Sequence, residues 1–345
     1  MASPYYLFAS NIGRCITTAL ACCVVVYLTS RQWQLRNRTV PISVNYHFTR
    51  KCNKTCKFCF HTEKSSHVAT EQQMKKGLKL LKDAGMRKIN FAGGEPLRYP
   101  KELAMLCRYC KEDLELESVS IISNGTLLKK KWLEQNGKFV DVMGISCDSF
   151  NEDTNEAIGR GSGRNVEQLF AIRQWCLELG IKFKLNTVVC KLNWQEDMVA
   201  TIAELDPFRW KCFQVLFVED ENDASRAQTK DDKRKRDARE LLISKEQFEA
   251  FCGKHEHLSC FVPEPNNLMA SSYLILDEYL CFLDKGSGRE KQSACILHVG
   301  VDRALQEINW DRAAFVKRGG EYDWSRGVSG DADGCGDGLP KKYEF

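Results

Sequence analysis

Three cysteines stand close together in the run Cys52-Asn-Lys-Thr-Cys56-Lys-Phe-Cys59. Cysteine thiolate is a soft ligand that suits iron–sulfur clusters and zinc. A structural zinc ion requires four ligands, as does an electron-carrying cubane, and the nearest histidines are His61 and His67. A Cys3His zinc site is therefore one interpretation. The other is a four-iron cluster on the three cysteines, which leaves one iron open to bind a reacting ligand.

Short polar turns follow the next three apolar, β-rich runs of the chain. Gly93-Gly94-Glu95-Pro96 follows the run 88–92, Ser123-Asn124-Gly125 ends the run 118–123, and Ser146-Cys147-Asp148-Ser149 ends the run 140–147. Glycine allows backbone groups to approach a ligand closely. Each turn alone is ordinary. Their recurrence at successive strand ends predicts one ligand-binding edge, as in α/β barrels.

Basic residues also occur within apolar runs, where lysine is not expected. Lys182 and Lys184 alternate and so share one face of a strand, as do Arg209 and Lys211, and Lys88 begins another strand. Charge at a strand start can serve solubility alone, which explains Lys88 or Lys182 equally well. Lys184 and Lys211 are flanked by large apolar residues, which favours a buried partner over water. A phosphorylated substrate would require several such fixed cations.

The elements that must position these residues alternate regularly. Apolar β-rich runs occur at 43–48, 88–92, 118–123, 140–147, 182–189 and 211–218. Helical patterns lie between them at 71–84, 101–114, 129–135, 166–179 and 194–205. Such alternation indicates a parallel sheet with right-handed crossovers. We therefore predict an α/β fold with a partial (βα)6 barrel and an active site at the carboxyl ends of its strands.

Four segments are expected along the chain: a membrane anchor and linker at 1–39, the partial barrel at 40–218, a substrate-covering C-terminal extension at 219–326 and a flexible tail at 327–345. The 16 residues from 15 to 30 carry no charge. This stretch is slightly shorter than the roughly 17–25 apolar residues of a spanning helix. Arginines follow this stretch at positions 31, 36 and 38, which places the downstream domain in the cytosol. A signal peptide and a buried helix are the alternatives.

The composition of the 345 residues, 43% hydrophobic and 28% charged, is that of a globular protein with a sizeable core. The net charge of +4 gives no indication of nucleic-acid binding, and none is expected. The seventeen cysteines are odd in number and irregularly spaced. They indicate a reducing compartment, in which a thiolate-held metal site can persist.

The spacing of the three cysteines, with Phe58 directly before the third, resembles that of the radical S-adenosylmethionine superfamily, as does Gly93-Gly94-Glu95-Pro96. Further motifs between about residues 43 and 324 are similar to those of the viperin family of antiviral nucleotide dehydratases. They are Asn45-Tyr-His-Phe-Thr-Arg, Cys59-Phe-His-Thr, Ile89-Asn-Phe-Ala-Gly-Gly-Glu-Pro, Ile145-Ser-Cys-Asp-Ser-Phe, Ile158-Gly-Arg-Gly, Ser272-Tyr-Leu-Ile-Leu-Asp-Glu-Tyr and Lys317-Arg-Gly-Gly.

The resemblance implies a [4Fe–4S] cluster on Cys52, Cys56 and Cys59, with S-adenosylmethionine as the second cofactor. The residues implied to contact S-adenosylmethionine are Phe58, Gly93, Gly94, Glu95, Ser123, Asn124, Ser146 and Arg160. Those implied to contact a nucleoside triphosphate are Asn45, Lys88, Lys184, Asn186, Arg209, Lys211 and Tyr273. Tyr273 is also the candidate proton donor.

The reaction implied by the resemblance begins with cleavage of S-adenosylmethionine to a 5′-deoxyadenosyl radical, which takes the 4′ hydrogen of CTP or UTP. Loss of the 3′ hydroxyl then gives 3′-deoxy-3′,4′-didehydro-CTP, a chain-terminating nucleotide. The family also implies the cytosolic face of the endoplasmic reticulum membrane or a lipid droplet, iron–sulfur assembly machinery and an electron donor. A radical enzyme with another substrate, or a membrane-tethered zinc or iron–sulfur interaction protein, are the alternatives.

The sequence departs from the family at Ala92, at its C-terminus and in its N-terminal segment, which is more uniformly apolar than the amphipathic helix of the family. Ala92 stands where vertebrate members carry serine, and the lost hydroxyl is expected to loosen discrimination between cytosine and uracil. The chain ends in Phe345 instead of the terminal tryptophan that cluster-loading machinery recognises in the family.

Overall fold

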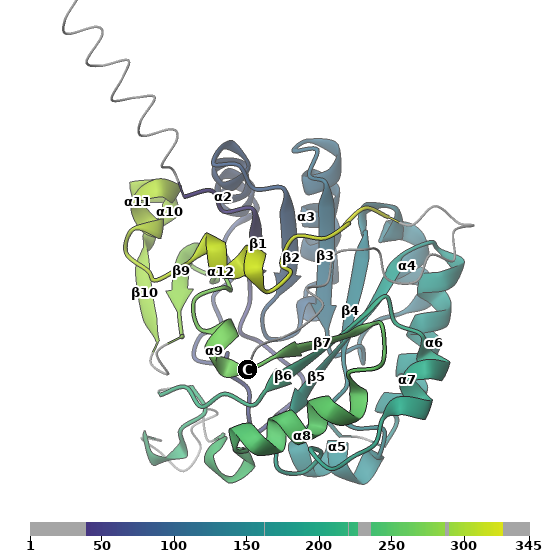
Figure 1. Ribbon diagram of the computed structural model, residues 1–345. Helices are drawn as coiled ribbons and strands as arrows, with labels where there is room; N and C mark the ends of the chain where they lie inside the picture. The colour runs from purple at the N-terminus through teal and green to yellow at the C-terminus, as the bar shows by residue number, and fades with distance from the viewer. Residues whose placement is uncertain (1–38, 162, 220, 227–235, 287–289, 327–345) are drawn as a thin grey trace, which may run out of the picture. The chain divides into compact units, whose positions relative to one another are not determined.

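The computed structural model describes residues 39–161, 163–219, 221–226, 236–286 and 290–326 (Figure 1). The described helices and strands all belong to one unit, which begins at Val40. The expected anchor before residue 39 and the expected tail after residue 326 lie outside the described residues. Within those residues, no helix has the length and apolar character needed to cross a membrane.

One sheet contains every strand of the described residues, in the order β10-β9-β8-β1-β2-β3-β4-β5-β6-β7. The strands from β1 to β7 pair in parallel, β8 pairs in parallel with β1, and β9 and β10 complete that edge in antiparallel fashion. Their bounds are β1 Ser43–His47, β2 Lys88–Ala92, β3 Ser118–Ser123, β4 Val142–Ser146, β5 Lys182–Val189, β6 Arg209–Gln214, β7 Phe261–Glu264, β8 Ile275–Leu276, β9 Cys281–Asp284 and β10 Lys291–Cys295.

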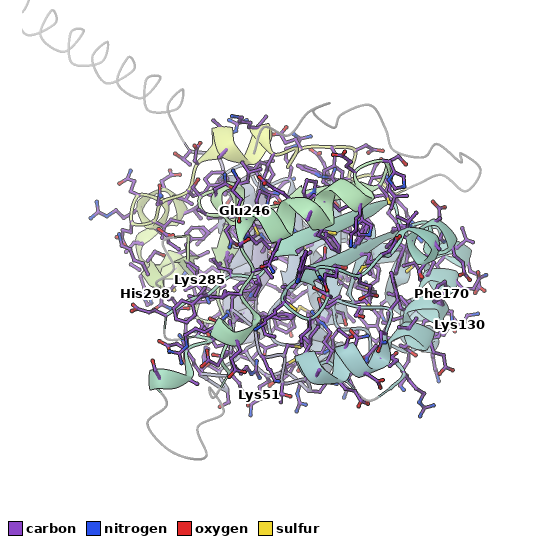
Figure 2. The ribbon with its side chains drawn as sticks, turned by 60° about the horizontal axis from the view of Figure 1, so that its bottom comes forward. Lys51, Lys130, Phe170, Glu246, Lys285 and His298 are labelled. Atoms are coloured by element: carbon purple, nitrogen blue, oxygen red, sulfur yellow. The ribbon has the colours of Figure 1, made fainter. Side chains whose placement is uncertain are left out.

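Helices follow the strands in the expected rhythm. Their bounds are α2 Glu71–Asp83, α3 Pro100–Glu112, α4 Lys130–Asn136, α5 Glu152–Ile158, α6 Asn165–Glu178, α7 Val199–Leu205, α8 Lys245–His255, α9 Asn266–Met269, α10 Ile296–Val299, α11 Val301–Leu305 and α12 Arg312–Lys317. Thr70 starts α2 with a capping box to Gln73. Lys130 of α4 lies on the same side of the molecule as Phe170 of α6 (Figure 2), and it pairs with Glu178 at 2.7 Å.

The two faces of the sheet differ in chemistry. The outer face carries apolar side chains such as Tyr46, Phe91 and Trp210, which belong to the hydrophobic core. Helices such as α3, α4 and α6 lie outside the strands (Figure 1). The inner face carries the alternate residues of the same strands, many of them polar. Register places Lys184 of β5 opposite Arg209 of β6. The helices therefore supply the core, and the inner face is left for binding.

The predicted α/β fold with a parallel sheet is confirmed, and all six expected strands are present in the expected order. The predicted bounds of the sixth strand are wrong: the strand expected at 211–218 is β6, Arg209–Gln214. The chain leaves the sheet because Asn222 accepts a hydrogen bond from Val218 N and donates one to Leu216 O, which holds a loop there. No sequence pattern indicated that the C-terminal extension adds β7 at one edge and β8 to β10 at the other.

The helix expected at 194–205 is also shorter than predicted, because α7 begins only at Val199. The backbone N–H of Met198, just before the helix, donates to Nε2 of the buried His255 at 3.0 Å. This side chain from α8 supplies a partner for one of the free backbone donors that every helix has at its start.

The last described residues lie across the amino ends of β4 and β5. Arg326 donates to the carbonyl of Gly137, ahead of β4, and to that of Gly180, ahead of β5. Lys182 pairs with Asp323 at 3.1 Å. Tyr322 inserts between Lys88, whose Nζ donates to its hydroxyl at 3.2 Å, and Arg209, which lies 4.1 Å over its ring. This segment closes the amino end of the inner face.

Candidate active site

A cavity of about 350 Å³ occupies the inner face of the sheet. Nearly all of the residues expected to bind cluster, cofactor or substrate line it: Cys52, Cys56, Cys59, Phe58, Gly93, Gly94, Ser123, Asn124, Ser146, Arg160, Asn45, Lys88, Lys184, Asn186, Lys211 and Tyr273. Two expected site residues, Glu95 and Arg209, do not line it. The volume falls in the usual range for small-molecule sites, roughly 300–1,000 Å³.

The cysteine loop leaves β1 and is held by the segment after α5. Thr55 N donates to Gly159 O at 3.2 Å, and Lys57 N donates to Ile158 O at 2.9 Å. Gly159 has φ +96°, and a Cβ on it would lie 2.5 Å from Thr55 O and 3.2 Å from Cys56 Cα. Only glycine allows this approach without strain. The three thiols thus face one cavity from a loop with fixed backbone contacts.

The three thiols of this loop are soft donors, which suit an iron–sulfur cluster and zinc alike. Among the residues that the structure describes, no group of three or more His, Cys, Asp or Glu is arranged to hold one metal ion. His67, one of the two candidates for a fourth zinc ligand, stacks on Tyr279 with ring centroids 4.5 Å apart. His61, the other, packs edge-on against His47 at 4.4 Å.

The glycine pair after β2 is pressed against the backbone that leads into the cysteine loop. Gly94 N donates to Thr49 O at 2.7 Å, and Glu95 N donates to Lys51 O at 2.8 Å. A Cβ on Gly93 or Gly94 would collide with the carbonyl of Thr49 or Lys51. Both glycines line the cavity beside the thiols. This close approach is the reason that the turn requires glycine.

Glu95 lies behind the cavity wall and not in it, so a direct contact with a cofactor remains a prediction. Its buried carboxylate accepts hydrogen bonds from Leu97 N at 3.0 Å, Ser123 Oγ at 2.8 Å and Asn124 N at 2.8 Å. Burial raises the pKa of this carboxyl, whereas the three hydrogen bonds lower it. In the structure, Glu95 orders the polar end of β3.

Arg160 lines the cavity on the other side of the cysteine loop. It forms an ion pair with the buried Asp148, which also accepts a hydrogen bond from Val188 N at 2.9 Å. Its guanidinium carbon lies 5.8 Å from the ring centre of Phe58, the residue before the third cysteine. Asp148 therefore fixes a cation beside the thiols, where a cofactor carboxylate would be attracted.

Three cations gather deeper in the cavity region. Lys88, Lys184 and Arg209 are buried, with exposed fractions of 4%, 8% and 6%. Among the described residues, no carboxylate forms an ion pair with Lys88 or Lys184. Burial and the nearby Arg209 lower the pKa of Lys88 to about 7. Burial also lowers the pKa of Lys184 to about 8, and Lys88 and Arg209 add to this effect. Such a cluster favours a multiply charged anion.

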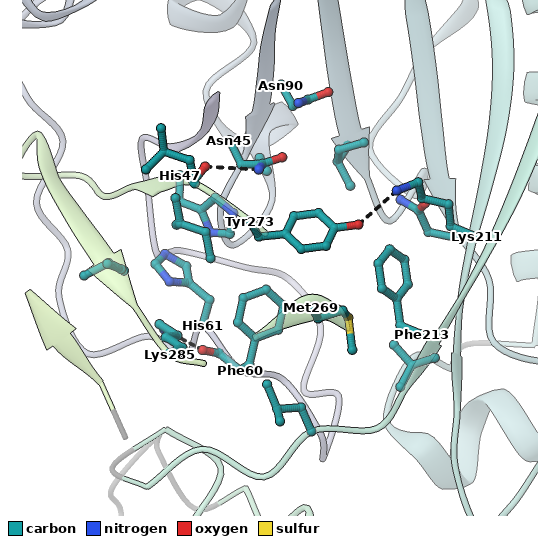
Figure 3. A pocket seen from close by; sticks show the side chains of 18 of the residues that line it. Asn45, His47, Phe60, His61, Asn90, Lys211, Phe213, Met269, Tyr273 and Lys285 are labelled. Carbon is teal, nitrogen blue, oxygen red and sulfur yellow. Dashed lines mark hydrogen bonds between the residues drawn. The ribbon is translucent and has the colours of Figure 1, made fainter. Parts of the chain in front are cut away.

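Tyr273 and Lys211 belong to a second polar cluster on the same cavity (Figure 3). Lys211 Nζ donates to the Tyr273 hydroxyl at 2.9 Å and pairs with Glu264. Glu264 also accepts from Tyr273 at 3.0 Å and from Arg318 at 3.1 Å. Burial opposes ionisation of Glu264, but Lys211 and Arg318 lower its pKa to about 2.

Sequence reasoning missed Glu264 and did not assign a role to Arg318. Arg318 stands in the motif Lys317-Arg-Gly-Gly, and its guanidinium lies 4.0 Å over the Tyr273 ring. Glu264 ends β7, whose residues alternate between the faces, so an inward carboxylate could have been inferred if β7 had been recognised. Tyr322 was missed because nothing local indicates that the C-terminal segment returns to the sheet.

Comparison with known proteins agrees with this geometry. Residues 46–205 match the model of the radical SAM superfamily. The chain is 48% identical over 290 residues to the S-adenosylmethionine-dependent nucleotide dehydratase RSAD2 of Oncorhynchus mykiss, covering 83% of this chain and 81% of that protein. It is 33% identical over 298 residues to the S-adenosylmethionine-dependent nucleotide dehydratase of Flammeovirga pacifica, covering 84% and 97%.

The fold is similar to that of Streptococcus suis SuiB, whose crystal structure was solved with S-adenosylmethionine bound. The TM-score is 0.53 at 16% identity, over 70% of this chain and 59% of SuiB. This likeness concerns the fold alone. The radical SAM superfamily implies a [4Fe–4S] cluster and S-adenosylmethionine as cofactors, and the cavity carries side chains that suit both. The chain is thus an enzyme, and it belongs to the viperin family of S-adenosylmethionine-dependent nucleotide dehydratases.

Proposed function

We propose that the protein converts CTP or UTP to the 3′-deoxy-3′,4′-didehydro nucleotide, a chain terminator for viral RNA synthesis. The observation that carries this proposal is one cavity shared by the thiols of Cys52, Cys56 and Cys59 and by the ammonium groups of Lys88 and Lys184. A nucleoside triphosphate is a small molecule with enough negative charge to compensate the buried cations.

The side chains near the thiols are suited to hold S-adenosylmethionine. When bound, this cofactor and the cluster supply a 5′-deoxyadenosyl radical. Gly93 and Gly94 allow close approach of the methionine part, and Arg160 offers a cation for its carboxylate. Ser123, Asn124 and Ser146 present polar groups at the ends of β3 and β4.

The substrate would lie along the inner face with its phosphates toward Lys88, Lys184 and Arg209. Arg209 does not line the cavity, so it would act through its charge or after a movement of Tyr322. Asn186 lies beside Lys211 in register, and its buried Oδ1 has no hydrogen-bond partner in the described part of the chain. Asn45 and Tyr273 would contact the sugar or base; the Asn45 amide already donates to Leu274 O at 3.1 Å.

The test is to incubate the anaerobically reconstituted, reduced enzyme with S-adenosylmethionine and each ribonucleoside triphosphate in turn. The expected result is 5′-deoxyadenosine together with a nucleotide that is lighter by one water, with CTP or UTP. A second candidate is a radical enzyme for an uncharged substrate. Lys184→Ala separates the two, because it should abolish turnover of a nucleotide and leave turnover of an uncharged substrate nearly intact.

Ala92 lines the cavity, which supports a looser choice between cytosine and uracil than a serine would allow.

We also propose that the segment before residue 39 anchors the enzyme at the cytosolic face of the endoplasmic reticulum or a lipid droplet. The uncharged stretch 15–30 and the arginines after it support this. Fractionation of cells that express the full chain or a form starting at Val40 tests it. Iron–sulfur assembly machinery and an electron donor remain the expected partners.

A further inference from the structure

We propose that Cys281 and Cys295 form a reversible disulfide, which fixes the β9–β10 hairpin against the segment that follows Cys59. The two residues are register partners on neighbouring antiparallel strands at one edge of the sheet (Figure 1). Both are free thiols in the structure, and neither lines the cavity. This modification site is therefore independent of the dehydration proposed above.

The backbone around the pair already has the geometry that a disulfide needs. Cys281 N donates to Asp277 Oδ1 and Cys281 O accepts from Asp277 N, both at 2.9 Å, so neither group bonds to Cys295. Ile296 N, one residue further, donates to Leu280 O at 2.9 Å. This pattern defines a non-hydrogen-bonded pair, in which the Cα atoms lie about 4.5 Å apart. Disulfides join Cα atoms separated by roughly 4.4–6.8 Å.

The two thiols differ in their access to solvent. A hydrogen bond joins the two side chains, so the sulfur atoms are already in contact. Cys281 is buried, with 8% of its surface exposed, whereas Cys295 is half-buried. Burial raises the pKa of Cys281 to about 12, and the charges of Asp277 and Cys295 add to this effect. Because the thiolate is the nucleophile, Cys295 reacts first with a dissolved reagent and Cys281 follows.

The oxidant is a low-molecular-weight disulfide such as oxidised glutathione. The thiolate of Cys295 attacks one of its sulfur atoms, the S–S bond breaks, and one thiol leaves with the proton that Cys295 lost. Cys281 then attacks the sulfur of Cys295 and releases the second thiol in the same way. The two cysteines thus lose two electrons and two protons, which the reagent receives. In a reducing compartment such a disulfide forms only transiently.

The hairpin that the disulfide fixes holds the segment after the third cluster ligand, Cys59. Lys285 directly follows β9, and its Nζ donates to Phe60 O at 2.6 Å. Glu290 directly precedes β10 and pairs with Lys64 at 3.5 Å. Each strand of the hairpin therefore leads into a residue that holds this segment. A covalent bond between the strands resists their separation and so keeps both contacts in place.

The test treats the anaerobically reconstituted enzyme with oxidised glutathione, while the bound cluster protects the thiols of its ligands. Remaining thiols are then alkylated, and the tryptic peptides are weighed. Trypsin cuts after Lys285 and Lys291, so Cys281 and Cys295 fall in separate peptides that only the disulfide joins. We expect this linked pair, lighter by two hydrogen atoms than the two free peptides together. Cys107 and Cys110, both fully buried on α3, are the internal control and should remain unmodified.

Cys281→Ser is the matched variant, because serine is close in size to cysteine but cannot complete the exchange. It should accumulate glutathione on Cys295, whereas the wild type should not. A wild-type enzyme that keeps the glutathione adduct, or that leaves both thiols free, overturns the proposal. The disulfide should also raise the unfolding midpoint of the wild type by on the order of 5 °C, since it closes a short loop. An unchanged midpoint would contradict the fixing of the hairpin.

Iron release measures the effect on the cluster loop. The oxidised wild type should lose iron to an Fe²⁺ chelator more slowly than a variant that carries both Cys281→Ser and Cys295→Ser and has had the same treatment. Equal rates would overturn the role of the hairpin in holding the segment after Cys59. Neither readout requires a nucleotide, so failure here is distinct from failure of the proposed function.

Discussion

The hydroxyl of Ser123 donates a 2.8 Å hydrogen bond to the carboxylate of Glu95. The two residues stand 28 positions apart in the sequence, at the ends of neighbouring strands. Asn124 N bonds to the other oxygen of the same carboxylate at 2.8 Å. The glycine turn after β2 and the polar end of β3 are therefore one unit. It borders the thiol of Cys52, to which the Asn124 amide donates at 3.8 Å.

Glu95→Gln should weaken this unit. An amide NH₂ facing Asn124 N–H would leave two buried donors opposed, at a cost of about 1–3 kcal/mol in the free energy of unfolding. We expect a lower denaturant midpoint and slower formation of 5′-deoxyadenosine. Glu134→Gln, at an exposed position of α4, is the control and should change neither. Equal behaviour of the two variants would contradict this role of Glu95.

Gly159→Ala should prevent proper loading of the cluster. The new Cβ would lie 2.5 Å from Thr55 O, so the loop that carries Cys52 and Cys56 must move. Iron and sulfide content after anaerobic reconstitution should fall, and 5′-deoxyadenosine formation with it. Gly253→Ala in α8 is the matched control, because nothing lies within 4 Å of the position that a Cβ would take there. That change should stabilise the protein by about 0.5–1 kcal/mol. Full iron content in Gly159→Ala would refute the prediction.

Nucleotide binding should weaken as the pH rises. Burial, with help from Arg209, lowers the pKa of Lys88 to about 7, and burial lowers that of Lys184 to about 8. Both lysines lose their charge in the empty cavity above these values, so binding of a triphosphate must be accompanied by proton uptake. Calorimetry at about pH 8, in two buffers of different ionisation enthalpy, measures this uptake directly. Binding without proton uptake would contradict the prediction.

Lys182→Gln is the control for this measurement. Lys182 lies one step along the same strand face as Lys184 but pairs with Asp323 and does not line the cavity. Its charge adds to the lowering of the Lys88 pKa, so its removal should decrease proton uptake only slightly, whereas Lys184→Gln should decrease it by more. Folding stability should change with pH in the opposite direction to nucleotide binding. The unfolded lysine has a pKa of 10.5, so between about pH 7 and 10 the unfolded chain binds more protons. The ligand-free enzyme should therefore become more stable as pH rises through this range.

Much of the inner face could be predicted from the sequence, because period-2 alternation of lysines in apolar strands leaves few other interpretations. Lys184 and Lys211 are buried as expected. The roles of Glu95 and Arg209 could not be predicted, because a sequence motif does not show how far a side chain lies from the cavity. Both side chains lie behind the cavity wall. The roles of Glu264 and Tyr322 could not be predicted for another reason. Short strands and segments of the C-terminal extension carry no periodic signal, and only the folded sheet shows which edge they join.

The central claim is that a carbon-bound hydrogen of a nucleoside triphosphate is removed by a radical formed beside Cys52, Cys56 and Cys59. The most direct measurement uses CTP, or UTP, labelled with deuterium at the 4′ position. The account predicts that the 5′-deoxyadenosine formed by the reduced enzyme carries one deuterium and that the dehydrated nucleotide carries none. Unlabelled 5′-deoxyadenosine, formed at the same rate with or without the nucleotide, would contradict it.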